Sequence, residues 1–79
     1  MIQVKLTGEF MKLAPAGSEK GSYSMEYRPG LTISRFVADL GVKERGIKYS
    51  VMVNNSRKPE DYELCDSDSV LIIPLLAGG

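Results

Sequence analysis

The run Val70-Leu71-Ile72-Ile73-Pro74 is continuously apolar, has the length of a strand, and follows the turn residues Asp66-Ser67-Asp68. An apolar run of this length is typical of a strand that is covered on both faces, or one whose outer face meets a partner. Proline cannot donate a hydrogen bond to a sheet, so we expect the strand to stop at Pro74. The run therefore predicts a central strand, followed by a flexible tail at residues 75–79.

Three earlier segments predict further strands of the same sheet. Polar and apolar residues alternate over residues 2–6, over residues 23–28 up to the turn Pro29-Gly30, and over residues 49–53. A period of two is the pattern of a strand with one buried face. A shorter pairing segment is expected near residues 62–64, which makes a sheet of four to five strands.

One segment predicts the main helix. Thr32 can accept a hydrogen bond from a free amide of the first turn. Gly41 supplies a left-handed C-terminal cap, after which Val42 is placed to pack back on the helix. The apolar residues between them have the spacing of one buried helical face, at Ile33, Phe36, Val37 and Leu40. A short, one-sided helix of this kind needs a sheet to cover.

The connection from Gly8 to Ser22 breaks both patterns, and its glycines and proline indicate irregular backbone. Phe10 and Leu13 are three residues apart, so one helical turn could bury both. A connection this long is unusual in a small domain unless part of it is ordered. We therefore expect partial order around these two side chains.

Size and composition indicate one globular domain. The chain has 79 residues, of which 43% are hydrophobic and 25% are charged. No apolar run approaches the roughly 20 residues that span a bilayer, and the first residues alternate instead of forming a signal peptide. The sequence thus predicts a cytoplasmic protein that does not insert into a membrane, with residues 1–74 as the domain.

The charge pattern argues against nucleic-acid binding. The formal net charge is zero, and Lys43, Arg45 and Lys48 are too few to indicate more than a solvated loop. Every lysine and arginine lies at or before Lys58. The following acidic stretch could steer the protein to a basic rim on a partner, or could form a solvated edge; it contains Glu60, Asp61, Glu63, Asp66 and Asp68.

The sequence lacks the residue combinations of the common catalytic sites. The chain has no histidine, so Cys65 has no histidine base and no metal cluster containing histidine can form. We expect Cys65 to pack as a small half-buried side chain, and Asp66 and Asp68 to be solvated caps of a turn. No glycine-rich phosphate loop is present. The sequence predicts a protein that is not itself an enzyme and binds no cofactor or metal.

The tail Leu75-Leu76-Ala77-Gly78-Gly79 is the remaining candidate for chemistry. A frayed terminus is the ordinary interpretation of such a segment. However, glycine has no β-carbon, so a Gly-Gly end can thread a narrow channel and leave its carboxylate unhindered. Five extended residues reach about 17 Å, far enough to enter another protein's active site. The tail therefore predicts a site at Gly78 and Gly79.

The strand order, the acidic turn, Pro74 and the terminal Gly78-Gly79 together resemble the MoaD/ThiS family of ubiquitin-like sulfur carriers. The resemblance covers nearly the whole chain. It implies an α+β fold, a ubiquitin-like β-grasp in which one main helix packs across one face of a mixed four- to five-stranded sheet. The last strand would then lie centrally, beside the first.

The same resemblance implies a mechanism and partners. A MoeB/ThiF-like adenylyltransferase of the ubiquitin-activating type would use ATP to adenylate the carboxylate of Gly79, with Gly78 providing the fit. A persulfide donor would then supply sulfur for a thiocarboxylate. The acceptor would be a molybdopterin synthase large subunit, which makes this chain its non-catalytic small subunit, or a thiazole synthase. The length of the chain favours the molybdopterin type.

A partner-binding surface can be predicted from the strand pattern. If Val70 and Ile72 face the helix, then Leu71 and Ile73 emerge on the opposite sheet face, where Met52 should join them. Such a patch usually marks a partner site, although a loop could cover it. The tail residues Leu75, Leu76 and Ala77 would extend this surface. A ubiquitin-like protein modifier joined through Gly79 and a non-conjugating β-grasp interaction module remain the alternatives.

Overall fold

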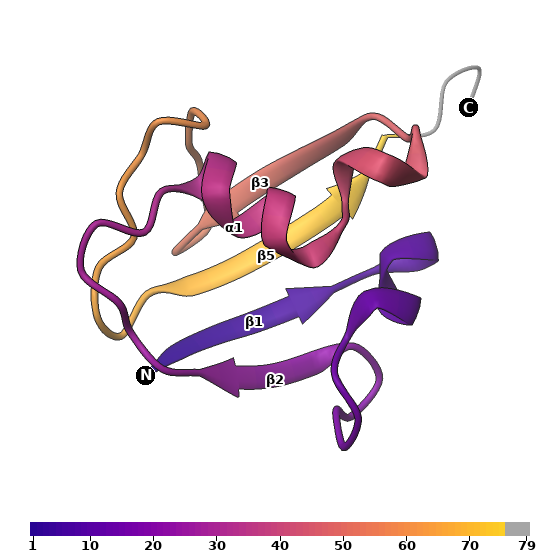
Figure 1. The fold of residues 1–79 in the computed structure, drawn as a ribbon, viewed down its shortest axis with the longest axis horizontal. Helices are drawn as coiled ribbons and strands as arrows, with labels where there is room; N and C mark the ends of the chain where they lie inside the picture. The colour runs from indigo at the N-terminus through magenta and orange to yellow at the C-terminus, as the bar shows by residue number, and fades with distance from the viewer. Residues whose placement is uncertain (76–79) are drawn as a thin grey trace.

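The computed structural model describes residues 1–75 of the chain. Figure 1 shows a twisted sheet with one main helix lying across one of its faces. The elements in chain order are β1 (Ile2–Leu6), η1 (Gly8–Leu13), β2 (Ser22–Met25), α1 (Ile33–Leu40), η2 (Lys43–Arg45), β3 (Tyr49–Val53), β4 (Ser56–Arg57) and β5 (Ser69–Pro74).

The sheet has five strands in the order β2-β1-β5-β3-β4. β5 lies at its centre, parallel to β1 on one side and antiparallel to β3 on the other. The two ends of β5 therefore lie at opposite ends of the domain (Figure 1). The predicted mixed sheet, with the last strand beside the first, is confirmed.

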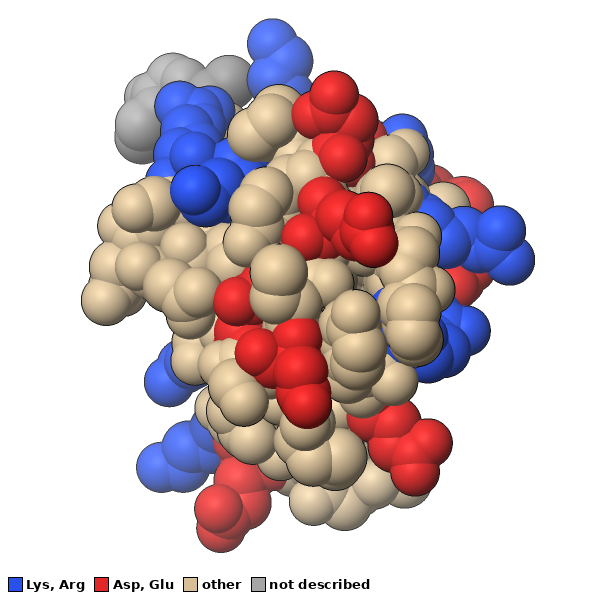
Figure 2. All heavy atoms as spheres, turned by 90° about the vertical axis from the view of Figure 1, so that its left-hand side faces the viewer, with Lys and Arg blue, Asp and Glu red and all other residues tan. Residues whose placement is uncertain are grey.

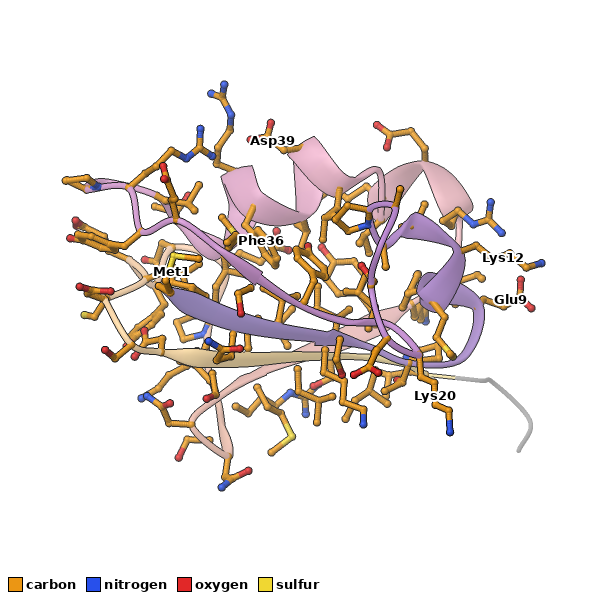
Figure 3. All side chains as sticks on the ribbon, turned by 90° about the horizontal axis from the view of Figure 1, so that it is seen from below. Met1, Glu9, Lys12, Lys20, Phe36 and Asp39 are labelled. Atoms are coloured by element: carbon orange, nitrogen blue, oxygen red, sulfur yellow. The ribbon has the colours of Figure 1, made fainter. Side chains whose placement is uncertain are left out.

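α1 forms where its capping residues predict it. The Thr32 hydroxyl accepts a hydrogen bond from the Arg35 N–H at 3.2 Å, and Gly41 ends the helix with a φ of 85°. Phe36 points from α1 toward the sheet and Asp39 points away from it (Figure 3). Within the described part of the chain, no helix is long and apolar enough to cross a membrane.

The core fills the space between α1 and the inner face of the sheet. Alternate residues of β1 are buried, as its pattern predicts, and Val70 and Ile72 of the neighbouring β5 are buried in the same way. Burying a large apolar side chain contributes about 1.5 to 3 kcal/mol. The largest fully buried side chains are Phe10, Ile2, Leu6, Ile33, Leu64, Ile72, Val37, Val42 and Val53.

Two predicted strands differ from those observed. β2 ends at Met25 and does not continue to Tyr27, because Met25 already pairs with Ile2, the first residue of β1. The short fourth strand is Ser56–Arg57 and not residues 62–64, which contribute only a bridge between Glu63 and Thr32. β1 offers no further partner to β2, so the second strand is shorter than its side-chain alternation suggests.

β4 pairs with β3 across a two-residue turn. Asn54 and Asn55 have φ values of 52° and 68° and form the two-residue loop between β3 and β4. Positive φ at both loop residues matches the twist of a tight hairpin, and asparagine tolerates that conformation. The chain therefore reverses directly after β3.

The connection after β1 is partly ordered, as predicted. Its first part forms the 3₁₀ helix η1, in which Phe10 is fully buried. The Phe10 ring meets Tyr49 of β3 edge to face, with 6.3 Å between ring centroids. η1 thus covers one end of the core, beside the end of β5.

Candidate functional site

The tail begins at Leu75, which we call the tail root and which is hydrogen-bonded to the segment before β3. Beyond Pro74, the Leu75 N–H donates to the Lys48 carbonyl oxygen at 2.7 Å, and 43% of Leu75 is exposed. The remaining predicted tail residues lie outside the described residues, namely Leu76, Ala77, Gly78 and Gly79. The structure therefore defines where the chain reaches the surface, and the roles of Gly78 and Gly79 stay predictions.

The outer face of the sheet, opposite α1, carries the predicted apolar residues. Leu71 of β5 lies directly across from Met52 of β3, and Ile73 lies across from Ser50. All three apolar residues are half-buried. On the other side, Leu71 pairs with Lys5 of β1, which is exposed. We define the outer patch as Met52, Leu71 and Ile73; its role in partner binding stays a prediction.

Part of the outer patch lies in a shallow hollow of the sheet. The hollow has a volume of about 510 Å³ and opens to solvent. Its lining contains both apolar and polar residues, as protein interfaces do. The apolar lining residues include Met52 and Leu71, and the polar ones include Gln3, Lys5, Asn54 and Asn55.

A groove that the sequence did not predict lies beside the tail root. Its volume is about 380 Å³, and it lies between β3 and the segment that follows β4. Glu60 lines the groove but pairs with Lys43 at 3.1 Å, an interaction that raises the pKa of Lys43. The other charged residues of the groove are basic, so it carries positive charge; they are Lys48, Arg57 and Lys58.

No local signal marks this groove in the sequence. Lys48 reaches the tail root only because Tyr49 is paired with Pro74, which places the start of β3 beside the end of β5. Arg57 arrives through the hairpin of β4. The interpretation of Lys48 as part of a solvated loop overlooked this register, which no sequence spacing encodes.

The turn before β5 contains a buried carboxylate. Asp68 is only 6% exposed, so its prediction as a solvated cap is wrong. Its oxygens accept from the Cys65 N–H at 2.8 Å, the Asn54 side-chain amide at 2.9 Å and the Tyr62 hydroxyl at 3.3 Å. Asn54 in turn accepts from the Ser69 N–H at 3.0 Å. The carboxylate joins the β3–β4 hairpin to the start of β5.

Asp66, on the same turn, is exposed as predicted and pairs with the chain terminus. The Met1 ammonium donates to its Oδ1 at 2.7 Å. This hydrogen bond, followed by the charge of the ammonium, lowers the pKa of Asp66 from its ordinary value. The pair ties the beginning of the chain to the turn that precedes β5.

A titration can test the Asp66 pair. Because the pKa is lowered in the folded state, the pair adds stability at neutral pH that is lost as the pH falls through the folded-state pKa. We expect the carboxyl carbon of Asp66, followed by NMR, to titrate below the ordinary value of about 3.9. Residues added before Met1 should move the ammonium away and raise the midpoint. A midpoint that the extension leaves unchanged contradicts this assignment.

The acidic stretch runs from Glu60, which lines the groove beside the tail root, to the turn at Asp66, which lies at the opposite end of the domain. Figure 2 looks at the end where β5 begins, and acidic side chains run down this end of the molecule. Asp66 belongs to this end, since it is bonded to Met1. The role of the acidic stretch in steering stays a prediction.

Cys65 is exposed, so its predicted half-buried position is wrong. The inward position is taken by its neighbour Leu64, which is 1% exposed, and the chain turns at Ser67 with a φ of 72°. Among residues 1–75, no group of three or more cysteine, aspartate or glutamate side chains could hold a metal ion. The expectation of a protein without its own catalytic centre stays a prediction.

Comparisons with known proteins bear on the fold. No protein-family model and no curated protein matches the sequence. Among solved structures, SAMP1 from Haloferax volcanii is similar, with a TM-score of 0.71 over 99% of this chain and 98% of that chain. The two sequences are 15% identical, so the likeness concerns the fold alone. The chain has a ubiquitin-like β-grasp fold.

Proposed function

We propose that this protein is a sulfur carrier of the MoaD/ThiS type, whose Gly79 carboxylate is adenylated by a partner and converted to a thiocarboxylate. The observation that carries the proposal is the central position of β5, which ends at Pro74, directly before the segment Leu75 to Gly79. A strand held on both sides is a rigid base for a short reactive tail. The molybdopterin pathway is the favoured destination of the sulfur, and thiamin synthesis is the second.

The proposed chemistry needs only the carboxylate from this chain. The carboxylate attacks the α-phosphate of ATP on the partner enzyme, forming an acyl-adenylate and releasing pyrophosphate. The terminal sulfur of a persulfide on a donor protein then attacks the carbonyl carbon and expels AMP, forming an acyl disulfide. A partner thiol attacks the disulfide, releases the thiocarboxylate and leaves a disulfide on the donor. No base or metal of the carrier takes part.

Two surfaces of the domain support this proposal. The outer patch offers apolar area within a polar rim, as partner interfaces do. The basic groove beside Leu75 adds charge that can orient an acidic partner surface and speed association. We propose that the adenylyltransferase contacts both, with Leu75, Leu76 and Ala77 entering its active site.

Intact mass tests the proposal directly. The full chain is expressed with each candidate adenylyltransferase encoded in the same genome, and its mass is measured with that of a chain lacking Gly78 and Gly79. We expect the full chain to gain the mass of one sulfur in place of one oxygen, and the shortened chain to stay unchanged. A Gly30→Ala control, remote from the end of β5, should be loaded like the natural chain.

Other outcomes would favour the alternatives. High-mass adducts that require Gly79 would identify a protein modifier, because the activated carbonyl would then have formed isopeptide bonds. An unchanged mass with every candidate enzyme, together with function retained after deletion of Gly78 and Gly79, would contradict both carrier and modifier. That result would leave a β-grasp interaction module that acts through the outer patch.

A further inference from the structure

The connection after β1 is hydrogen-bonded to the end of β5. The Thr7 N–H and the Thr7 hydroxyl both donate to the Ile72 carbonyl oxygen, at 3.2 and 3.0 Å. Residues 7 and 72 are 65 positions apart in the sequence. Figure 3 shows Glu9 and Lys12 of η1 at this end of the domain and Met1 at the other. The element that follows β1 is therefore built against the strand that carries the tail.

Gly8 makes the closest approach in this contact. A Cβ atom at Gly8 would lie 2.7 Å from Cγ and 3.4 Å from Cδ of Pro74. Carbon atoms pack best at about 3.5 to 4.0 Å, so the first of these contacts could exist only if η1 or Pro74 moved. Gly8 also has a φ of 56°, where side chains are strained. The absence of a side chain lets η1 close on Pro74.

The opposite side of the same segment is held by β3. The Leu75 N–H donates to the Lys48 carbonyl oxygen at 2.7 Å, and Tyr49 pairs with Pro74. The ring of Pro74 restricts its own φ angle. Pro74 and Leu75 therefore lie between Gly8 on one side and the β3 end of the sheet on the other.

We propose that Gly8 is a positioning residue for the tail: by allowing η1 to close on Pro74, it sets the direction in which the chain leaves the sheet at Leu75. The inference rests on the proposed function, since direction matters only if Gly79 must reach a reacting centre. Because the four residues beyond Leu75 can span at most about 14 Å, the direction at the root limits which part of a partner Gly79 can reach. A misplacement of about 1 Å at a reacting group can cost roughly a hundredfold in rate.

The first test compares Gly8→Ala with Gly30→Ala. Both glycines have positive φ, but a Cβ at Gly30 would meet nothing within 4 Å. Pyrophosphate release is measured with the adenylyltransferase that loads the natural chain, at a temperature where circular dichroism shows all variants folded. We expect Gly8→Ala to lower kcat by roughly tenfold or more. KM should change little, because the outer patch is intact, and Gly30→Ala should retain the natural rate.

A second variant separates the contact with Pro74 from a general loss of structure. Pro74→Ala removes the two atoms, Cγ and Cδ, that the new side chain would meet. In that background the same Gly8→Ala change is expected to cost less than about threefold, because the pair is coupled through this contact. Equal losses in both backgrounds, or a Gly8→Ala rate equal to that of Gly30→Ala, would overturn the proposal.

Amide hydrogen exchange decides the same question without a partner. We expect Gly8→Ala to speed exchange of the Leu75 amide, while the Asn54 amide, which donates to the Ser69 carbonyl oxygen at the other end of β5, changes no more than in Gly30→Ala. Unchanged protection of Leu75 would overturn the role of Gly8. If no adenylyltransferase acts on the natural chain, the proposed function fails, and exchange at Leu75 still shows whether Gly8 controls the root of the tail.

Discussion

Replacing Gly21 by alanine is expected to lower the free energy of unfolding by about 3 to 5 kcal/mol. Gly21 lies beside β1 and accepts a hydrogen bond from the Leu6 N–H at 2.9 Å through its carbonyl oxygen. A Cβ at this position would fall on the carbonyl oxygen of Leu6, a backbone atom that cannot rotate away. The φ of 85° adds the strain of a left-handed residue.

Gly17 provides a matched control in the same connection. Its φ is 90°, close to that of Gly21, but a Cβ there would meet nothing within 4 Å. Gly17→Ala should therefore show only the backbone strain, about 1 to 2 kcal/mol. Urea unfolding of the two variants measures the difference. If both lose the same free energy, the close approach of Gly21 to Leu6 does not limit stability.

Asp68→Ala is expected to destabilise the protein by about 2 to 4 kcal/mol, which for a domain of this size lowers Tm by about 10 to 25 °C. The substitution removes an acceptor from three donors at once, namely the Cys65 N–H, the Asn54 amide and the Tyr62 hydroxyl. Donors left unpaired in a buried site cost more than the net energy of the bonds they lose. Thermal unfolding followed by circular dichroism measures the effect.

Asp66→Ala serves as the control for Asp68→Ala. It removes a carboxylate from the same turn, but the side chain of Asp66 is 61% exposed and water can replace its partner. Exposed ion pairs contribute little to stability, so Tm should change far less than in Asp68→Ala. Similar losses in the two variants would show that the charge of the turn, and not the buried hydrogen bonds of Asp68, holds it in place.

Features that depend on neighbouring residues were predicted well. α1 begins after Thr32 and ends at Gly41, because capping bonds form within a few residues of each other. The outer patch was placed correctly from strand alternation alone, since successive side chains of a strand point to opposite faces. The sites at Gly78 and Gly79 rest on the sequence only and lie outside the described residues.

Features that depend on a partner strand were predicted less well. The alternation through Tyr27 is present, but β1 has no residue left to pair with it. Cys65 was expected to be half-buried and Asp68 exposed, but Asp68 is buried and Cys65 is exposed. The path of the turn places Asp68, and not Cys65, against the Asn54 side chain. Propensity describes what a segment can form, and pairing decides how much of it forms.

The chain's periodicity and capping residues specify which side chains become core and where α1 lies, because both arise from backbone geometry over a few residues. Only the folded arrangement brings Gly8 against Pro74 and Lys48 beside Leu75. These contacts follow from the parallel pairing of β5 with β1 and its antiparallel pairing with β3. Strand register is a property of two distant segments packed on one core, so no single stretch of sequence contains it.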